Sequence, residues 1–528
     1  MKKLLPWLFS VTAGVLAFLG YVGYNQFYLE WFFLVPLLWA ARKAPPGRAF
    51  LLGWTAGTVG YAGGFYWFVH MLTTFAGLNL AFSLLGLFLF SAFNGLSFAI
   101  FTWAACRLRL TKGWSVWWTA PFIWTAIENV YPFLFPNYMG ASQYLLLPLT
   151  QIADITGILG ISFLLIWCNA TVYTAMESLI ERREIELRKI AIFLAAIGLT
   201  AAYGMVRIGQ IDAAVNVAPK LKVVMIQTGE GEASKFNDPL SFIRLHQKMS
   251  QRAILGKPAD DADLVIWPES VSVYPISREL KQLPQDLFGN TGKPLLFGTI
   301  TAERLNGKIQ KYASALLADG QNTVLGLYDK RILVPFGEYI PFGDIFPVLY
   351  KWLPYTSRLQ PGKHPDSLPF GSYRLSLNIC YEDLFYGLIR QNMTAGILDR
   401  KDPPHAIINL TNDSWYGDTI EPLEHLVSAS FRSIEHRRAL VRSTNTGISA
   451  IVDPVGRLEK RTGQWTQETL VGEVPMMSGR TIFSHAGNWF GLAVTAFVLV
   501  LLGISFKPTG KTEKKKHLRK AQRKTKNR

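Results

Sequence analysis

The most reactive side chains in this sequence are a thiol, an amine and two carboxylates that lie far apart along the chain. Cys380 stands in SLNICYEDLF, where a β-prone run gives way to two acids, and Glu269 follows the apolar run LVIW and Pro268. Lys330 lies in YDKRILVPFGEY, with Glu338 eight residues after it. A thiol needs a base to become a thiolate, and a developing oxyanion needs a cation or fixed N–H donors. These residue types therefore indicate nucleophilic acyl chemistry.

Each of these residues also has an ordinary structural interpretation. A free cysteine is most often a small buried hydrophobe, and Glu269, at a strand boundary marked by Pro268, could cap the next helix. Lys330 and Glu338 could be solvated surface charges. The combination of base, cation and thiol at successive strand or loop ends favours the catalytic interpretation.

The histidines do not suggest a metal site, and no cofactor is expected. The eight histidines form neither HExxH nor another metal-binding spacing. His425 and His436 lie in an amphipathic helical pattern, and we expect them to be packing or surface residues.

Short β-branched runs alternate with helical patterns in the second half of the chain, which predicts an α/β layered domain. Ligands in such folds gather where strands end, and Glu269, Cys380, Asn412 and Asp413 all lie near the ends of predicted strands. The predicted strands cover 221–227, 262–270, 294–300, 312–318, 373–383, 405–413 and 446–454, and the main helical patterns cover 240–254 and 423–440.

The first half of the chain is too apolar for a wholly soluble protein. Runs of about 20 apolar residues predict eight transmembrane helices. The first could instead be a cleaved signal peptide, but no small-residue cleavage site stands out and further spans follow at once. The predicted spans are 4–23, 27–41, 49–69, 80–105, 115–135, 156–176, 189–207 and 484–505.

Basic residues mark alternate connections between these spans. By the positive-inside rule both termini face the cytoplasm, and the segment from about 208 to 482 lies on the far side, which in a bacterium is the periplasm. The connections with Lys or Arg are the start of the chain, 42–48, 107–112 and 182–189, whereas those near 23–26, 70–79 and 136–155 contain neither.

The net charge of +17 is concentrated at the C-terminus, where 507–528 hold eleven Lys or Arg against one Glu. This tail lacks apolar periodicity, so we expect a disordered segment attracted to the membrane surface, with no nucleic-acid partner. The expected organisation is seven spans in 1–210, a periplasmic catalytic domain in 211–482, one span in 483–506 and a cytoplasmic tail in 507–528.

This topology isolates Cys380 from the other two cysteines. Cys106 and Cys168 fall in or at the ends of predicted spans, so the exported segment holds one thiol and no partner for a disulfide. Glu128, in the fifth predicted span, is costly in lipid and should face the bundle interior or its interface.

Five motifs in order resemble the carbon-nitrogen hydrolase (nitrilase) domain, and the helices around it resemble the apolipoprotein N-acyltransferase family. The resemblance covers nearly the whole chain and implies an αββα sandwich on a membrane bundle. The motifs are WPES, DKRILVPFGEYIPFG, NICYED, NLTNDSWYGD and RSTNTGISA. The family's catalytic triad falls on Glu269, Lys330 and Cys380, with Glu338, Tyr381 and Glu382 at its further essential positions. One departure is Phe236 in SKFNDP, where the family often has a Trp whose indole N–H a phenyl ring cannot replace.

The resemblance implies acyl transfer in two steps through a thioester on Cys380. Glu269 would take the thiol proton, Lys330 and the backbone N–H of Tyr381 would hold the oxyanion, and Glu338 would orient Lys330. The donor would be a phospholipid, with phosphatidylethanolamine expected. The acceptor would be the α-amino group of a diacylglyceryl-cysteine at a lipoprotein N-terminus. We expect a monomer in the bacterial inner membrane.

Two other functions fit parts of the sequence. A membrane-tethered amidase would use the same triad with water as the acceptor. A non-catalytic lipid-binding or transport module would explain the helices but not three reactive residue types at strand ends.

The stretch 340–362 is rich in aromatic residues, Pro and Gly. Its Pro and Gly content argues against a regular element, and burial in the domain core is one interpretation. We favour a mobile lid that dips Phe346, Leu349, Trp352 and Leu353 into the outer leaflet and admits lipid to the triad.

Overall fold

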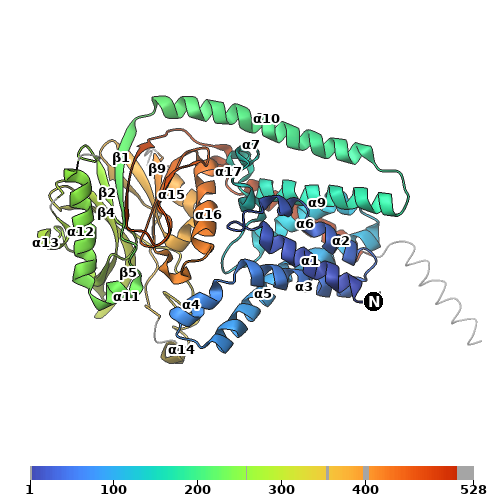
Figure 1. Ribbon diagram of the computed structural model, residues 1–528, viewed down its shortest axis with the longest axis horizontal. Coiled ribbons are helices and arrows are strands. Elements are labelled where there is room, and N and C mark those ends of the chain that lie inside the picture. Colours follow the sequence, from blue (N-terminus) through green and yellow to red (C-terminus); the bar gives the residue numbers. More distant parts are fainter. Residues whose placement is uncertain (1–2, 257–258, 290, 353–355, 396–402, 508–528) are drawn as a thin grey trace, which may run out of the picture.

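The computed structural model describes residues 3–256, 259–289, 291–352, 356–395 and 403–507, and it has two parts (Figure 1). One part consists of two β-sheets with helices on their outer faces. The other is a bundle of helices from the first half of the chain, which the last helix, α18 (Trp489–Phe506), joins. The basic tail after Lys507 lies outside the described residues.

The first sheet is centred on β1 (Lys220–Gln227) and β2 (Leu264–Ile266), which pair in parallel. β2 pairs in parallel with β4 (Leu295–Leu305), and the order is β13-β1-β2-β4-β5-β6, with β3 also paired to β4. The remaining strands of this sheet are β3 (Ser272–Ser277), β5 (Lys308–Ala318), β6 (Val324–Asp329) and β13 (Glu468–Pro475).

The second sheet contains three parallel neighbours, β8 (Tyr373–Ile379), β9 (Ala406–Thr411) and β10 (Ala439–Thr444). Antiparallel strands extend it on both sides in the order β12-β11-β10-β9-β8-β7. They are β7 (Ser367–Phe370), β11 (Ala450–Val452) and β12 (Leu458–Arg461). Parallel strands end at the same edge, so the residues that follow β8 and β9 are brought together.

Alternate side chains of the two sheets share one buried core. Met225 and Leu296 of the first sheet belong to the same buried cluster as Leu377 and Ile408 of the second. Because side chains alternate along a strand, the intervening residues point outward and pack under helices. The helix α12 (Pro239–Leu255) covers the first sheet, and α15 (Tyr386–Thr394) and α16 (Glu421–His436) cover the second. This α–β–β–α sandwich confirms the layered domain expected from the sequence.

A helix coincides with each apolar run of the sequence. Among the described residues, four helices are long and apolar enough to cross a membrane, namely α5, α9, α10 and α18. Glu128 is buried in the bundle, where its carboxylate accepts hydrogen bonds from Trp124 Nε1 and the Met139 N–H, both at 2.9 Å. The helices before α18 are α1 (Leu5–Gly20), η1 (Phe27–Trp31) with α2 (Leu34–Ala41), α3 (Pro46–Gly64), α4 (Phe68–Thr74), α5 (Leu80–Lys112), α6 (Val116–Val130), α9 (Leu159–Ile180) and α10 (Leu187–Val217).

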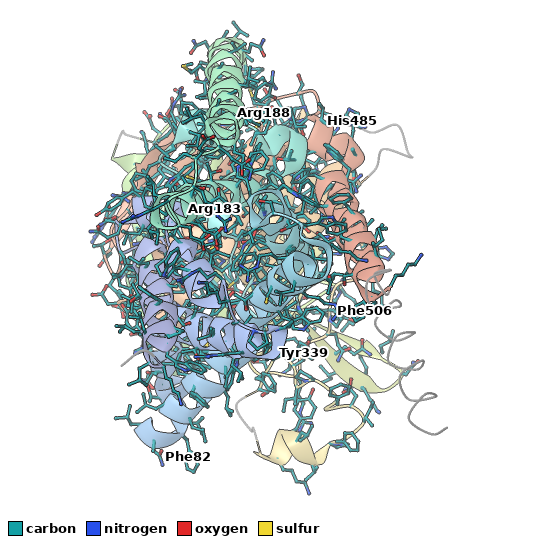
Figure 2. All side chains as sticks on the ribbon, turned by 90° about the vertical axis from the view of Figure 1, so that its right-hand side faces the viewer. Phe82, Arg183, Arg188, Tyr339, His485 and Phe506 are labelled. Carbon is teal, nitrogen blue, oxygen red and sulfur yellow. The ribbon has the colours of Figure 1, made fainter. Side chains whose placement is uncertain are left out.

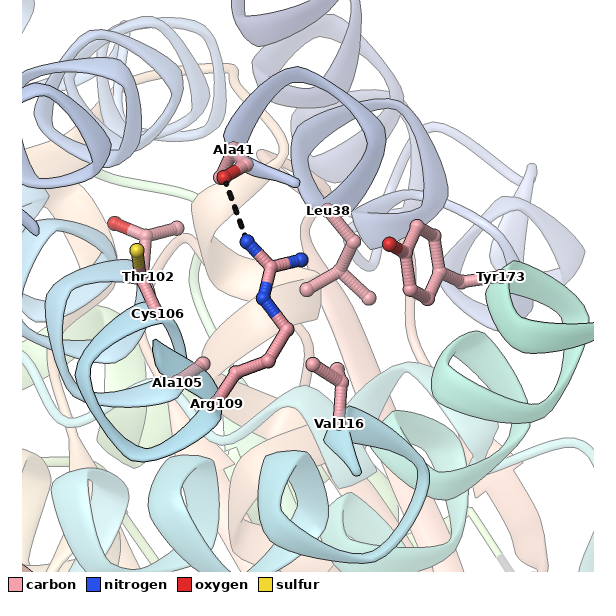
Figure 3. A pocket seen from close by; sticks show the side chains of 8 residues that line it. All are labelled: Leu38, Ala41, Thr102, Ala105, Cys106, Arg109, Val116 and Tyr173. Carbon is pink, nitrogen blue, oxygen red and sulfur yellow. Dashed lines mark hydrogen bonds between the residues drawn. The ribbon is translucent and has the colours of Figure 1, made fainter. Parts of the chain in front are cut away.

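The basic connections gather at the end of the bundle far from the sheets. The chain begins at this end, on the right of Figure 1, and Figure 2, which faces it, labels Arg183 and Arg188 there. Arg109, near the end of α5, donates to the carbonyl of Ala41 at the end of α2, at 3.3 Å, beside a cavity of about 10 Å³ (Figure 3). A cation in this position satisfies carbonyls that a helix leaves unpaired at its C-terminus.

Ion pairs fasten the sandwich to the helices. Asp154 of the short helix α8 (Ala153–Thr156) is buried and accepts from Arg437 at 2.8 Å and from Arg207 of α10 at 3.1 Å. Asp212, further along α10, pairs with Arg457 at 2.6 Å. Both of these side chains are more than a third exposed.

Two expectations about local structure are wrong. The helix expected over 423–440 ends at His436, because Arg437 adopts a left-handed φ of 52° and Ala439 begins β10. Glycine usually occupies such a position, so an arginine there gives no sequence signal for a helix end. The stretch 340–362 contains a short helix, α14 (Val348–Trp352), despite its Pro and Gly content.

Candidate active site

Three of the predicted site residues come directly from strand ends. Lys330 follows β6, Cys380 follows β8, and Glu269 lies three residues beyond β2. The Lys330 Nζ lies 3.2 Å from Glu269 Oε1 and 2.7 Å from Glu338 Oε1. The structure therefore brings Glu269, Lys330 and Glu338 together in a site where each of these side chains is at most 13% exposed.

Glu338 is held by its own loop. Its second carboxylate oxygen accepts the Val334 N–H at 2.8 Å, while the first accepts from Lys330. A carboxylate fixed in this way limits the rotamers open to the Lys330 side chain. Glu338 thus links Lys330 to the backbone of its own loop.

Close packing of backbone places Glu269. A Cβ added to Gly298 of β4 would lie 2.5 Å from the Glu269 Cα, a distance that no side chain tolerates. Gly298 also accepts the Val271 N–H at 2.8 Å. The glycine therefore lets the chain around Glu269 lie against the next strand of the sheet.

Cys380 occupies a strained turn. Its φ is 50°, and the 3-10 helix η3 (Cys380–Leu384) begins at this residue. Left-handed backbone is unfavourable for a residue with a Cβ and persists only where the surroundings hold it. The Cys380 side chain is 4% exposed.

Glu382 links this turn to the chain after Lys330. Its carboxylate accepts the N–H groups of Ile379 at 2.8 Å, Arg331 at 2.6 Å and Ile332 at 3.1 Å. The Glu382 carboxylate therefore fixes the Cys380 turn relative to the segment that carries Lys330.

The charges of the site act on one another. Burial raises the pKa of Glu269, and burial and the Glu269 charge raise the pKa of Cys380 well above its usual range, while Lys330 lowers both. Although burial opposes it, the carboxylates of Glu269 and Glu338 hold the pKa of Lys330 well above its usual range. A cationic lysine beside a carboxylate of raised basicity and a protonated thiol can support general-base activation of the thiol.

The bundle forms one wall of the site. The Tyr381 hydroxyl donates to the carbonyl of Leu134, which follows α6 in the bundle. The Tyr381 ring meets Phe135 edge-on with centroids 5.7 Å apart. Trp67, between α3 and α4, donates to Glu424 of α16 at 3.2 Å. The Cys380 turn therefore faces apolar helices rather than open solvent.

Phe236 does not join this cluster of contacts. It lies in α11 (Glu232–Asn237) and is 65% exposed. Its neighbour Lys235 is buried, pairs with Glu232 at 2.6 Å and lowers the pKa of Glu269. A lysine beside an aromatic residue carries no sequence signal of burial, so no role was expected for Lys235.

A second group of buried charges adjoins Cys380, and the sequence did not predict that these residues contact one another. We call Asp383, Asp413, His425 and Arg442 the buried charge network. His425 Nε2 lies 2.8 Å from Asp383, and Arg442 binds Asp383 at 2.8 Å and Asp413 at 3.0 Å. Burial alone would raise the pKa of Asp413, but Arg442 and His425 lower it to about 2. His425 is buried and both of its ring nitrogens have buried partners, so a surface position is excluded.

His436 is also buried, with Nδ1 2.8 Å from the Ser484 hydroxyl, so a surface position is excluded. Asp413, Glu421 and His425 offer ligand atoms within 4.8 Å of one another, a spacing that could hold a metal ion. Arg442, however, lies 2.8 Å from His425 Nδ1 and donates to Asp413. A guanidinium already supplies positive charge to this group.

Comparisons with known proteins agree with this fold. Residues 13–171 match the apolipoprotein N-acyltransferase N-terminal domain, and residues 222–482 match the carbon-nitrogen hydrolase family. The apolipoprotein N-acyltransferase of Geobacter metallireducens is 29% identical over 517 residues, 95% of each chain. That of Rickettsia prowazekii is 30% identical over 362 residues, 67% of this chain and 68% of the other.

Among solved structures, a Saccharomyces cerevisiae member of the nitrilase superfamily is 17% identical, with a TM-score of 0.36 over 48% of this chain and 90% of that one. The two family matches together with the relatives, which extend over nearly the whole chain, give the classification. This chain belongs to the apolipoprotein N-acyltransferase family.

Proposed function

We propose that this protein transfers an acyl chain from a phospholipid to the α-amino group of the N-terminal diacylglyceryl-cysteine of apolipoproteins. The observation that carries the proposal is the cluster of Glu269, Lys330 and Glu338 beside the strained Cys380 turn, walled by the bundle. An enzyme whose two substrates are both lipids needs its nucleophile at the joint between a catalytic domain and apolar helices.

The first half-reaction forms a thioester. Glu269 takes the thiol proton, and the Cys380 sulfur attacks the carbonyl carbon of the phospholipid ester. Lys330 and the backbone N–H of Tyr381 stabilise the tetrahedral oxyanion. The ester C–O bond then breaks, Glu269 returns the proton to the departing glycerol oxygen, and lysophospholipid leaves.

The second half-reaction forms the amide. The free amine of the acceptor attacks the thioester carbon, and Glu269 accepts a proton from the nitrogen. The C–S bond breaks, and the proton passes to the sulfur, which restores Cys380. No cofactor takes part in either step. Phosphatidylethanolamine is the proposed donor, and a monomer is the proposed active state.

We place the protein in a bacterial inner membrane with eight spans and the domain 211–482 in the periplasm. The basic connections at the end of the bundle opposite the sheets support this orientation (Figures 1 and 2). The proposed remainder is seven spans in 1–210, the last span in 483–506 and a cytoplasmic tail in 507–528.

We propose that the stretch 340–362 is the lid that admits lipid. Ile345 is 69% exposed and Phe346 is 57% exposed, so these side chains are not part of the domain core. Leu349 is half-buried, whereas Leu353 and the side chain of Trp352 lie outside the described residues. Exposed apolar side chains next to the site favour contact with the membrane surface.

Mass spectrometry tests the chemistry directly. The full chain incubated with phosphatidylethanolamine alone should gain one acyl chain on Cys380, which neutral hydroxylamine releases. Cys380→Ala should lose the adduct and all triacylated lipoprotein. Glu269→Gln and Lys330→Ala should each slow adduct formation by roughly a hundredfold.

Product analysis separates transfer from hydrolysis. Triacylated lipoprotein together with lysophospholipid is the expected pair of products. Free fatty acid as the main product would identify a hydrolase, and near-normal transfer by Cys380→Ala would end the thioester mechanism.

A further inference from the structure

The buried charge network reaches the nucleophile's backbone along two paths. Asp383 lies in η3, three residues after Cys380, and accepts from Arg442 and His425. Asn409 of β9 donates to the Cys380 carbonyl at 3.3 Å, and its own oxygen accepts from Arg442 at 3.0 Å. Arg442 therefore binds Asp383, near the end of the Cys380 turn, and Asn409, whose side chain binds the Cys380 carbonyl at its start.

A third path leads to the sulfur. Thr411, the last residue of β9, donates to Asp413 at 3.3 Å, and Arg442 and His425 fix Asp413. The Thr411 side chain also lies near the thiol and lowers the pKa of Cys380. The network thus reaches the Cys380 turn through Asn409 at the Cys380 carbonyl, through Thr411 near the thiol, and through its own member Asp383.

These contacts act where the backbone needs support. Cys380 has a left-handed φ of 50°, which a residue with a Cβ adopts only when neighbouring contacts outweigh the preference for another conformation. Asp383, Asn409 and Arg442 are all fully buried, so no water competes for their hydrogen bonds. Buried ion pairs seldom add net stability over apolar packing, so stability alone does not account for this network.

The geometry requires arginine at the centre. Nη1 of Arg442 binds Asp383 and Asn409, and Nη2 binds Asp413. A planar guanidinium directs these donors at fixed angles, whereas a lysine ammonium concentrates its charge at one point and cannot span all three partners.

We propose that Arg442 and His425 are positioning residues that hold Cys380 in the left-handed turn that places its sulfur beside Glu269 and Lys330. The inference rests on the proposed function, because it assumes that Cys380 carries the acyl chain. Neither residue contacts the reacting carbonyl. Their loss should misplace the nucleophile and slow the chemical step without weakening donor binding.

The test measures the rate of Cys380 acylation in a single turnover, with the full chain in mixed micelles of detergent and phosphatidylethanolamine. Arg442→Lys should lower the rate at saturating donor by roughly ten- to a hundredfold, with the half-saturating donor concentration unchanged. Asp383→Asn keeps the side-chain shape and should show the same separation. His425→Gln, whose amide can still donate to Asp383, should retain more activity than His425→Ala.

The matched control is Arg438→Lys. Arg438 is nearly as buried as Arg442 but, among the described residues, binds only backbone carbonyls, those of Pro404, His436, Arg437, Ser478 and Gly479. It should lower the melting temperature and leave the acylation rate of the folded protein unchanged. This control separates the loss of a buried arginine from the loss of nucleophile positioning.

Two results would overturn the inference. Acylation within twofold of wild type by folded Arg442→Lys would do so, and if that variant does not fold, the same result for Asp383→Asn would decide. Equal loss in Arg438→Lys would reduce the effect to general destabilisation. Failure of the wild-type protein to acquire any adduct that Cys380→Ala lacks would instead overturn the proposed function and the inference with it.

Discussion

At the scale of single residues, the site depends on how two carboxylates share one ammonium. Lys330 contacts Glu269 and Glu338 at once, so neither carboxylate has a charge environment independent of the other. Glu338 also raises the pKa of Glu269, because two negative charges near each other favour protonation of one. The second carboxylate therefore sets both the direction of the lysine and the basicity of the proposed base.

The substitution Glu338→Gln tests this coupling through pH. Removing the Glu338 charge should lower the pKa of Glu269, so the acidic limb of the acylation rate should move to lower pH. The maximal rate should fall by roughly tenfold, because the partner that lies 2.7 Å from the Lys330 ammonium loses its negative charge. Rates measured between pH 4 and 9 give both quantities.

The exposed Glu459 provides the control for this experiment. Glu459→Gln should leave the limb and the maximum in place. A limb that stays fixed or moves to higher pH in Glu338→Gln would contradict the proposed charge coupling.

At the scale of elements, the stretch 340–362 stands out because its apolar side chains lie outside the core. Phe342, Ile345, Phe346 and Val348 are exposed, and α14 carries the last of them. The Leu80 end of α5 and α14 lie at the same lower end of the molecule in both views (Figures 1 and 2). A lipid that enters between two apolar elements would leave the membrane without crossing water.

We expect the triple substitution of Phe342, Ile345 and Phe346 to Ser to impair the use of membrane-bound donor. Each of these side chains contributes about 1.5 to 3 kcal/mol when buried in lipid, so insertion of the segment into the bilayer, and with it turnover of vesicle lipid by the reconstituted protein, should fall by tenfold or more. The melting temperature should stay nearly unchanged, since the side chains are exposed. Turnover of vesicle lipid and of a monomeric short-chain phospholipid should be compared, and only the first should fall.

Leu255→Ser is the control for an exposed apolar residue elsewhere. Leu255 ends α12 on the outer face of the sandwich and is 82% exposed. A fall of many degrees in the melting temperature of the triple variant would show that the segment packs against the core.

At the scale of the whole molecule, ion pairs join sandwich and bundle at places of different burial. Asp154→Asn should destabilise the protein by roughly 3 to 5 kcal/mol, because it leaves the buried Arg437 without its charge partner. Asp212→Asn should cost about 1 kcal/mol or less, because the Arg457 pair is solvent-accessible and Arg457 keeps Asp453. Thermal unfolding in detergent measures both, and equal shifts would contradict the argument from burial.

Orientation in the membrane is also a property of the whole chain. A reporter active only outside the cytoplasm should be active when fused after residue 215 and silent when fused after residue 510. The basic connections at one end of the bundle are the physical reason. The reverse pattern would exclude periplasmic chemistry.

Much of this architecture is predictable because its signals are local. The apolar runs coincide with helices, and the β-branched runs of 221–227 and 405–413 coincide with β1 and β9. Reactive residues at strand ends are likewise visible in the sequence, since a strand and its end are marked within ten residues. The strand β10 was missed because the helical pattern of α16 continues into its first two residues and the turn at Arg437 lacks glycine.

By itself, then, the sequence determined the order of apolar segments, the layered character of the domain and the places of Glu269, Lys330 and Cys380. Only the tertiary structure decided which charges meet. The contacts of Arg442 with Asp383 and Asn409 join residues 59 and 33 positions apart and exist because β8, β9 and β10 are parallel neighbours. Hydropathy and turn signals act over a few residues, whereas the pairing of buried charges depends on strand order, which no local pattern encodes.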